Sequence, residues 1–128
     1  MKIIKSLSLA LLLICLVSSM ALAANTTIRS GNFIEIILDG STDWDITTTV
    51  AANGVALKSI AFYPSAANDV LVVRDGSATG TRIFSGKDVG GGGIIVYYDG
   101  IMAKPYIKAS SCTLGTPANA RVIITTSR

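Results

Sequence analysis

Between Asn32 and Thr126 the chain consists of short runs rich in Ile, Val, Thr, Tyr and Phe, separated by clusters of Gly, Asn, Asp, Ser and Pro. Runs of this composition between turn residues are typical of β-strands. No segment keeps a helical period. The expected strands are 33–38, 46–50, 55–63, 69–74, 81–84, 94–98, 103–109 and 120–126. They predict an all-β fold, a single antiparallel β-sandwich of about eight strands that is jelly-roll-like or immunoglobulin-like.

The pattern within the runs predicts which strands are central and which faces point inward. Residues 70–73 and 94–96 are apolar on both faces, which favours central strands. In the last run Val122 and Ile124 share one face, which we expect to face the core. Pro105 lacks a backbone donor, so its strand is expected to begin there or to lie at an edge.

The first 23 residues have the three parts of a secretory signal peptide. Lys2 and Lys5 precede an apolar run over residues 7–17, and Ala21-Leu22-Ala23 ends at the expected cleavage point. The alternative is an uncleaved membrane anchor, but the run is shorter than the about 20 residues that span a bilayer. We therefore expect residues 1–23 to be a cleaved signal, residues 24–128 to be one β-sandwich domain, and the protein to be secreted, periplasmic or on the cell surface.

Charge and cysteine content limit the partners of the mature domain. Removing Lys2 and Lys5 from the 11 basic residues leaves nine against eight acidic residues, with no basic cluster. Neither nucleic acid nor, after signal removal, a membrane is therefore an expected partner. Cys112 is the only cysteine beyond residue 23, and we expect a small buried side chain, with an intermolecular disulfide as the alternative.

The residues do not form a recognisable catalytic motif. The chain has no histidine, which excludes histidine triads and histidine-liganded zinc. Gly86-Lys87 is followed by Asp88, and the glycines at 90–93 precede a strand, so a phosphate-binding loop is not predicted. Residues 90–93 are expected to connect antiparallel strands, and residues 76–80 to form a hairpin loop. We expect the protein not to be an enzyme and to need no cofactor.

The strongest candidate for a ligand site is the segment Asp43-Trp44-Asp45. With Asp39 it places three carboxylates within seven residues around the only tryptophan. Several oxygens from one loop suit calcium, although the spacing is not that of an EF-hand. The structural alternative is that Asp43 and Asp45 bind loop amides while Trp44 packs on the core.

Tyr97 and Tyr98 are the second candidate, as an aromatic platform for a sugar or a protein partner. Adjacent strand residues face opposite sides of a sheet, so at most one of these two can lie in the core. The other is expected to be exposed or at an interface.

The segments SIAFYPSAANDVLVVRDG (59–76) and KPYIKASSCTLGTPANARVIIT (104–125) resemble small, uncharacterised all-β proteins of phage and environmental bacterial genomes. The resemblance covers about a third of the chain and includes no chemical motif. It implies a compact β-domain of a structural or virion-associated kind. The secretion signal is a departure from what a capsid-assembled protein needs.

The sequence as a whole predicts an exported, non-enzymatic β-sandwich that acts as a structural or surface-binding module and self-associates or binds a surface glycan or protein. Residues 24–32 are expected to be a free arm available for strand exchange with another copy. The alternative function is a carbohydrate- or calcium-binding module that uses Asp43, Trp44 and Asp45.

Overall fold

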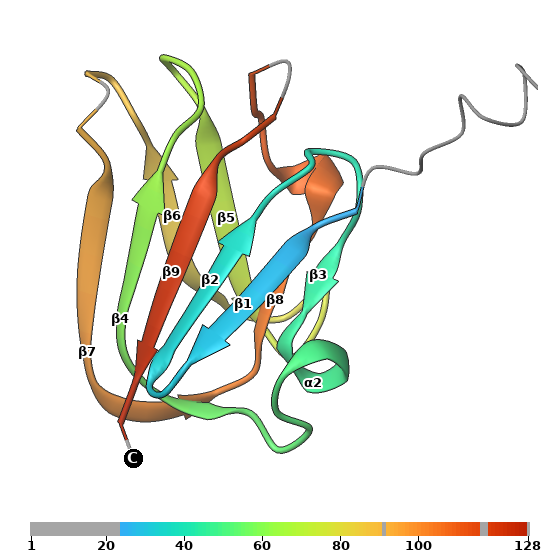
Figure 1. Ribbon diagram of the computed structural model, residues 1–128, viewed down its shortest axis with the longest axis vertical. Coiled ribbons are helices and arrows are strands. Elements are labelled where there is room, and N and C mark those ends of the chain that lie inside the picture. The colour runs from blue at the N-terminus through green and yellow to red at the C-terminus, as the bar shows by residue number, and fades with distance from the viewer. Residues whose placement is uncertain (1–23, 91, 116–117, 128) are drawn as a thin grey trace, which may run out of the picture.

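The computed structural model describes residues 24–90, 92–115 and 118–127, which form two antiparallel β-sheets. The five-stranded sheet has the order β1 (Thr26–Ser30), β2 (Phe33–Ile37), β9 (Arg121–Thr126), β4 (Val55–Tyr63) and β7 (Ile94–Ala103). The four-stranded sheet has the order β3 (Trp44–Asp45), β8 (Pro105–Ile107), β5 (Val70–Asp75) and β6 (Arg82–Lys87). In Figure 1 the five-stranded sheet lies in front, between β7 on the left and β1 on the right. The predicted all-β sandwich is confirmed, and the predicted signal peptide, residues 1–23, lies outside the described residues.

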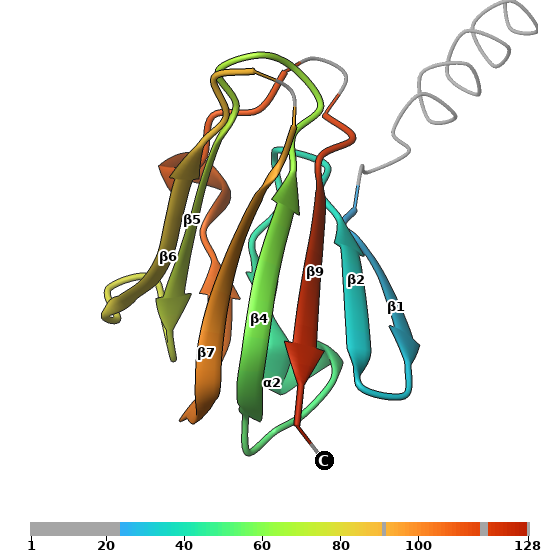
Figure 2. The same cartoon turned by 90° about the vertical axis from the view of Figure 1, so that its left-hand side faces the viewer.

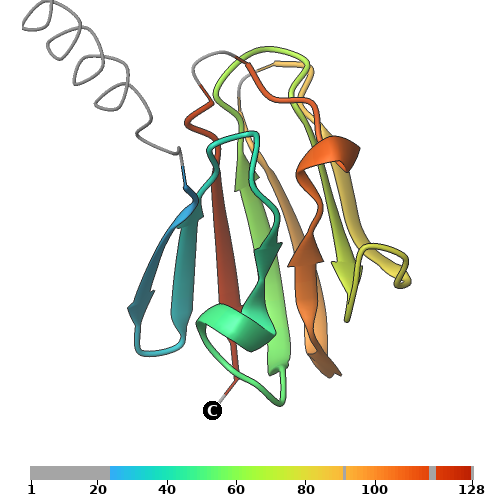
Figure 3. The same ribbon diagram turned by 90° about the vertical axis from the view of Figure 1, so that its right-hand side faces the viewer.

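Four of the strand pairs are nested in the sequence. β2 pairs with β9, β3 with β8, β4 with β7, and β5 with β6, always antiparallel. The loop at 76–81 closes the innermost pair, which confirms the predicted hairpin. From β2 to β9 the chain is therefore one long antiparallel ribbon, and its successive pairs alternate between the two sheets (Figures 2 and 3).

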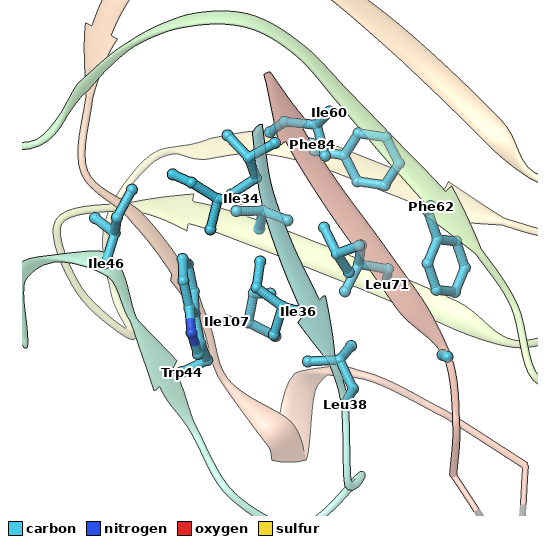
Figure 4. Packing of buried hydrophobic residues seen from close by; sticks show 14 of the residues in the cluster. Ile34, Ile36, Leu38, Trp44, Ile46, Ile60, Phe62, Leu71, Phe84 and Ile107 are labelled. Atoms are coloured by element: carbon cyan, nitrogen blue, oxygen red, sulfur yellow. The ribbon is translucent and has the colours of Figure 1, made fainter. Parts of the chain in front are cut away.

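The core lies between the two sheets and is made of side chains that alternate along each strand. Val122 and Ile124 of β9 are fully buried, which confirms the predicted inward face. β5 lies between β8 and β6, which confirms that residues 70–73 belong to a central strand. Figure 4 shows the packing of the cluster and labels Ile34, Ile36, Leu38, Trp44, Ile46, Ile60, Phe62, Leu71, Phe84 and Ile107.

The predicted strand at 46–50 is wrong, because Ile46–Thr49 form the short helix α2. The Asp45 carboxylate caps this helix by accepting hydrogen bonds from the Thr47 amide at 2.8 Å and the Thr47 hydroxyl at 2.7 Å. The Thr49 hydroxyl donates to the Asp45 carbonyl at 2.7 Å. These local side-chain bonds outweigh the β-preference of the Ile-Thr-Thr-Thr run.

The predicted free arm at 24–32 is also wrong, because β1 in this segment pairs with β2 along its whole length. Gly31 makes the tight turn between the two strands with a φ of +57°, a backbone conformation that favours glycine. The Thr27 hydroxyl accepts a hydrogen bond from the indole nitrogen of Trp44 at 2.8 Å, which ties β1 to the other sheet.

The strand that begins at Ile94 differs from the prediction in two ways. β7 is an edge strand and not a central one, and Ile95 and Val96 are exposed. It also continues through Asp99-Gly100, where Gly100 has a φ of +69° and the register with β4 shifts. The expected break between the strands at 94–98 and 103–109 is thus a bulge within one strand. The glycine loop before it crosses from β6 in one sheet to β7 in the other.

Pro105 and Cys112 lie close to their predicted environments. Pro105 is the first residue of β8, as predicted. Cys112 is partly buried against the core, with its sulfur 3.9 Å from the Val72 carbonyl oxygen. Burial raises the pKa of this thiol above its ordinary value, which disfavours the reactive thiolate.

Asp69 joins two loops that are distant in the sequence. Its carboxylate is buried and accepts hydrogen bonds from the Ser65 amide at 2.7 Å, the Ala66 amide at 2.9 Å and the Gly115 amide at 2.7 Å, and from the Ser65 hydroxyl at 2.8 Å. Burial acts to raise the pKa of Asp69, but these four hydrogen bonds outweigh it and the net shift is downward.

We predict that Asp69→Asn lowers the free energy of unfolding by about 2 kcal/mol at pH 7, because the bonds to a charged acceptor are weakened. Since the folded-state pKa lies below the ordinary value of 3.8, the ionised group stabilises the fold fully at higher pH. That contribution disappears as the pH falls through the lowered folded-state pKa. Urea unfolding of both proteins between pH 2 and 7 measures it, and a difference that stays constant at low pH would contradict the assignment.

Candidate functional site

The outer face of the five-stranded sheet is the candidate site, and the strand register defines its members. One cross-strand row joins Ile28, Glu35, Ile123, Ala61 and Ile95, and the next joins Phe33, Thr125, Ser59 and Tyr97. A third row joins Ile37, Arg121 and Tyr63. We call the apolar members the outer apolar face: Ile28, Phe33, Ile37, Ala61, Tyr63, Ile95, Tyr97 and Ile123.

Most of the large side chains of the outer apolar face are exposed, at positions where the outer surface of a sheet is normally polar, whereas Ala61 at its centre is only 7% exposed. Ile28 and Ile95 are about half exposed at 50% and 49%, Phe33 is 56% exposed and Tyr97 is 79% exposed. A five-stranded sheet of five-residue strands covers roughly 400 Å² in projection at ordinary strand spacing. This area includes the polar side chains of Glu35, Ser59, Arg121 and Thr125, so its apolar part is smaller than the whole. The largest apolar patch on a typical monomer is about 300–600 Å² and often marks a contact surface.

The outer face of the four-stranded sheet is polar by contrast. Asp45, Tyr106 and Arg74 oppose one another across β3, β8 and β5. Ser85 and Lys87 lie opposite Val72 and Val70 of β5, and Val72 is only 8% exposed. Among the described residues, every large apolar side chain classed as exposed lies on the five-stranded sheet except Val89, which is in the loop before β7. Of the two outer faces, that of the four-stranded sheet is therefore the more polar and that of the five-stranded sheet the more apolar.

Two opposite charges lie within the outer apolar face and pair with each other. The guanidinium of Arg121 is 3.2 Å from a carboxylate oxygen of Glu35, and it lies 5.8 Å from the centre of the Tyr63 ring. Exposed ion pairs of this kind stabilise a fold by at most about 1 kcal/mol. Their effect here is to leave the face with balanced charge and an aromatic ring covered by a cation.

Tyr97 and Tyr98 face opposite sides of β7, as predicted. Tyr97 points outward on the outer apolar face. Tyr98 packs against the core, and its hydroxyl donates a 2.6 Å hydrogen bond to the Ile83 carbonyl on β6. Burial raises the pKa of Tyr98 above its ordinary value. Of these two tyrosines, only Tyr97 therefore offers a ring face to a partner.

Asp43, Trp44 and Asp45 lie elsewhere, at the β3 edge of the four-stranded sheet, and the structure does not bring them together with Tyr97. Asp43 accepts from the Tyr106 hydroxyl at 2.6 Å and from the Ala109 amide at 2.8 Å, and these bonds lower its pKa. Trp44 is 2% exposed, so its ring lies in the core and not on a surface where a sugar could stack. Asp45 caps α2. Ligand binding at this segment stays a prediction.

Asp39, the other carboxylate of this region, also forms local hydrogen bonds. Asp39 accepts from the amides of Ser41 and Thr42, each at 2.8 Å, and from the Thr42 hydroxyl at 2.6 Å. Burial acts to raise the pKa of Asp39, and the hydrogen bonds outweigh it. Within the described part of the chain, no three His, Cys, Asp or Glu side chains are placed to hold a metal ion together.

The chain was compared with protein families, curated proteins and solved structures, and no match was found in any of the three. In the described ranges no helix has the length and apolar character to cross a bilayer.

Most of this face is not evident from the sequence. The inward position of Val122 and Ile124 places Ile123 on the outer side, but no comparable signal marks Phe33, Ile28 or Ile95 as surface residues. The run Phe33–Ile37 is apolar at both alternating sets of positions except at Glu35. Such a run fits a doubly covered strand as well as a sheet with an apolar outer surface.

We predict that the double variant Phe33→Ser, Tyr97→Ser loses most binding of a hydrophobic dye such as ANS, while its free energy of unfolding changes by less than about 1 kcal/mol, as expected of surface substitutions. Lys87→Ser on the polar face is the matched control and should leave dye binding unchanged. Equal dye binding by all three proteins would show that the outer apolar face is not the accessible apolar surface.

Proposed function

We propose that the protein is an exported, non-enzymatic, jelly-roll-like β-sandwich that acts as a structural or surface-binding module through the outer apolar face. The observation that carries the proposal is the contrast between the two outer faces. An uncovered apolar sheet face tends to attract non-specific contacts, so a stable fold that retains one is best explained by a molecule that covers it.

The topology supports the jelly-roll part of this proposal. Nested pairs that alternate between two sheets are the pattern of an eight-stranded jelly roll, with β1 as an additional strand on one edge. Jelly rolls include capsid and lectin domains, in which the sandwich is a scaffold for contacts. Because one fold supports many functions, the topology supports a contact module without naming its partner.

Export is supported by the sequence of residues 1–23. The basic residues, apolar run and Ala-x-Ala end follow the order of a signal peptide. The mature domain would then act in the medium, the periplasm or at the cell surface. The module would reach a partner there by diffusion. Because the charges of Glu35 and Arg121 balance each other, the outer apolar face favours neither a positively nor a negatively charged partner.

The carboxylates support a non-enzymatic role. Asp39, Asp43, Asp45 and Asp69 accept hydrogen bonds from nearby amides or hydroxyls, with the distances given above. In Asp39, Asp43 and Asp69 these bonds lower the pKa, whereas a general acid needs a raised one. These groups are thus suited to holding loops.

We predict that residues 24–128 associate as concentration rises and that Phe33→Asp weakens association at least tenfold, because burial of a phenylalanine side chain contributes about 1.5–3 kcal/mol. Size-exclusion chromatography with light scattering measures the mass. Val89→Asp is the control, since Val89 is 84% exposed but lies off the sheet. An average mass that rises with concentration equally in the wild type, Phe33→Asp and Val89→Asp would contradict a role for the outer apolar face.

A further inference from the structure

The four edges of the two sheets differ in how they are protected from pairing with another chain. β3 has two residues, and β6 carries Arg82 and Lys87. β1 has five residues, of which four are Thr, Arg or Ser. Short, charged and polar edges of these kinds resist pairing with other strands.

β7 has none of these protections over its first half. It is the longest strand, with ten residues, and residues 92–98 carry neither a charge nor a proline. The bulge at Gly100 interrupts the edge only beyond that segment. Ile94–Tyr98 is therefore a straight, apolar edge at one side of the molecule, at the left in Figure 1.

From this edge we infer that a second copy of the chain pairs its β7 with the first, antiparallel, about a twofold axis through Val96. The inference deepens the proposed function and depends on it, because it names the first partner of the module. Directly opposed residues must lie on the same face of a sheet, so a twofold axis must pass through a residue and not between two. With the axis at Val96, Ile95 opposes Tyr97 of the second copy and Ile94 opposes Tyr98.

This register gives every side chain an apolar partner. The Ile95–Tyr97 pairs lie on the outer face, and aromatic pairs with β-branched residues contribute to sheet stability. No like charges meet across the axis, because the segment has no charged residue. Pairing of β7 with β1 of another copy would instead place Thr, Arg and Ser against the apolar edge.

Edge pairing also enlarges the outer apolar face. Two five-stranded sheets joined at β7 form one continuous sheet whose outer surface, with apolar and polar residues together, is roughly 800 Å² in projection at ordinary strand spacing. This is the area that each partner contributes to a typical stable protein interface, about 800 Å². One copy alone provides about half of it.

The test is disulfide crosslinking of cysteine variants in a Cys112→Ser background, with folding checked by circular dichroism. In the proposed pairing Val96 opposes itself at a Cα separation of about 4.5–5.5 Å. A disulfide accepts about 4.4–6.8 Å. We expect Val96→Cys to form a covalent dimer at least tenfold faster than Ile28→Cys, a half-exposed control on the β1 edge.

A second pair of variants fixes the register. Ile95→Cys and Tyr97→Cys should crosslink when mixed, because these positions oppose each other, and only slowly alone, because each then meets itself on a diagonal of about 7–8 Å. Equal rates for Val96→Cys and Ile28→Cys would overturn the inference. So would crosslinking of Ile95→Cys in a mixture with Ile28→Cys and not with Tyr97→Cys, since Ile28 and Ile95 lie on the same face and such a crosslink would show head-to-tail pairing of β7 with β1.

Failure of this inference is distinguishable from failure of the proposed function. Phe33 lies on β2, three strand positions from β7, so Phe33→Asp does not touch the paired edge. Association that depends on Phe33, without crosslinking at Val96, would overturn the pairing of β7 edges but would still support association through the outer apolar face. Crosslinking at Val96, with association that Phe33→Asp does not change, would support the pairing of β7 edges and would contradict association through the outer apolar face.

Discussion

The core between the two sheets is the interaction on which the rest of the structure depends. Inward side chains such as Ile36 and Val122 from one sheet meet Leu71 and Ile107 from the other, and all four are fully or almost fully buried. Because the strand pairs are nested, the five-stranded sheet is complete only when β2 and β9, near the two ends of the described chain, have paired. Most contacts are therefore distant in sequence, which indicates slow folding compared with a helical protein of this size.

The same constraint leaves the two outer faces free to differ. Alternation along a strand decides which residues reach the core, and it leaves the remaining residues open to selection for other reasons. On β8 and β5 those residues include Tyr106 and Arg74, while on β2 and β7 they include Phe33 and Tyr97. A sandwich needs only one apolar face on each sheet, the face toward the core. The five-stranded sheet has apolar residues on its outer face as well, and this additional apolar surface is the basis of the proposed contact role.

Much of the fold could be predicted from the sequence, but little of the site could. Strand composition and turn residues were enough for the sandwich and for the inward face of Val122. They failed at Ile46–Thr49, where the Asp45 cap outweighs β-branching, and at β7, because an apolar run does not tell a covered strand from an exposed edge. Strand order depends on long-range pairing, so the sequence alone does not show that Phe33 and Tyr97 lie in one row, at either side of Thr125 and Ser59.

The central claim is that the outer apolar face is covered by another molecule, and solvent paramagnetic relaxation by NMR tests it most directly. A soluble paramagnetic agent relaxes exposed methyl groups, and signals from Ile28, Ile95 and Ile123 can be compared with those of Val89, which lies off the sheet. As protein concentration rises, we expect the isoleucine methyl groups to become shielded while those of Val89 do not. Isoleucine methyl groups that stay as accessible as in the dilute monomer would contradict it.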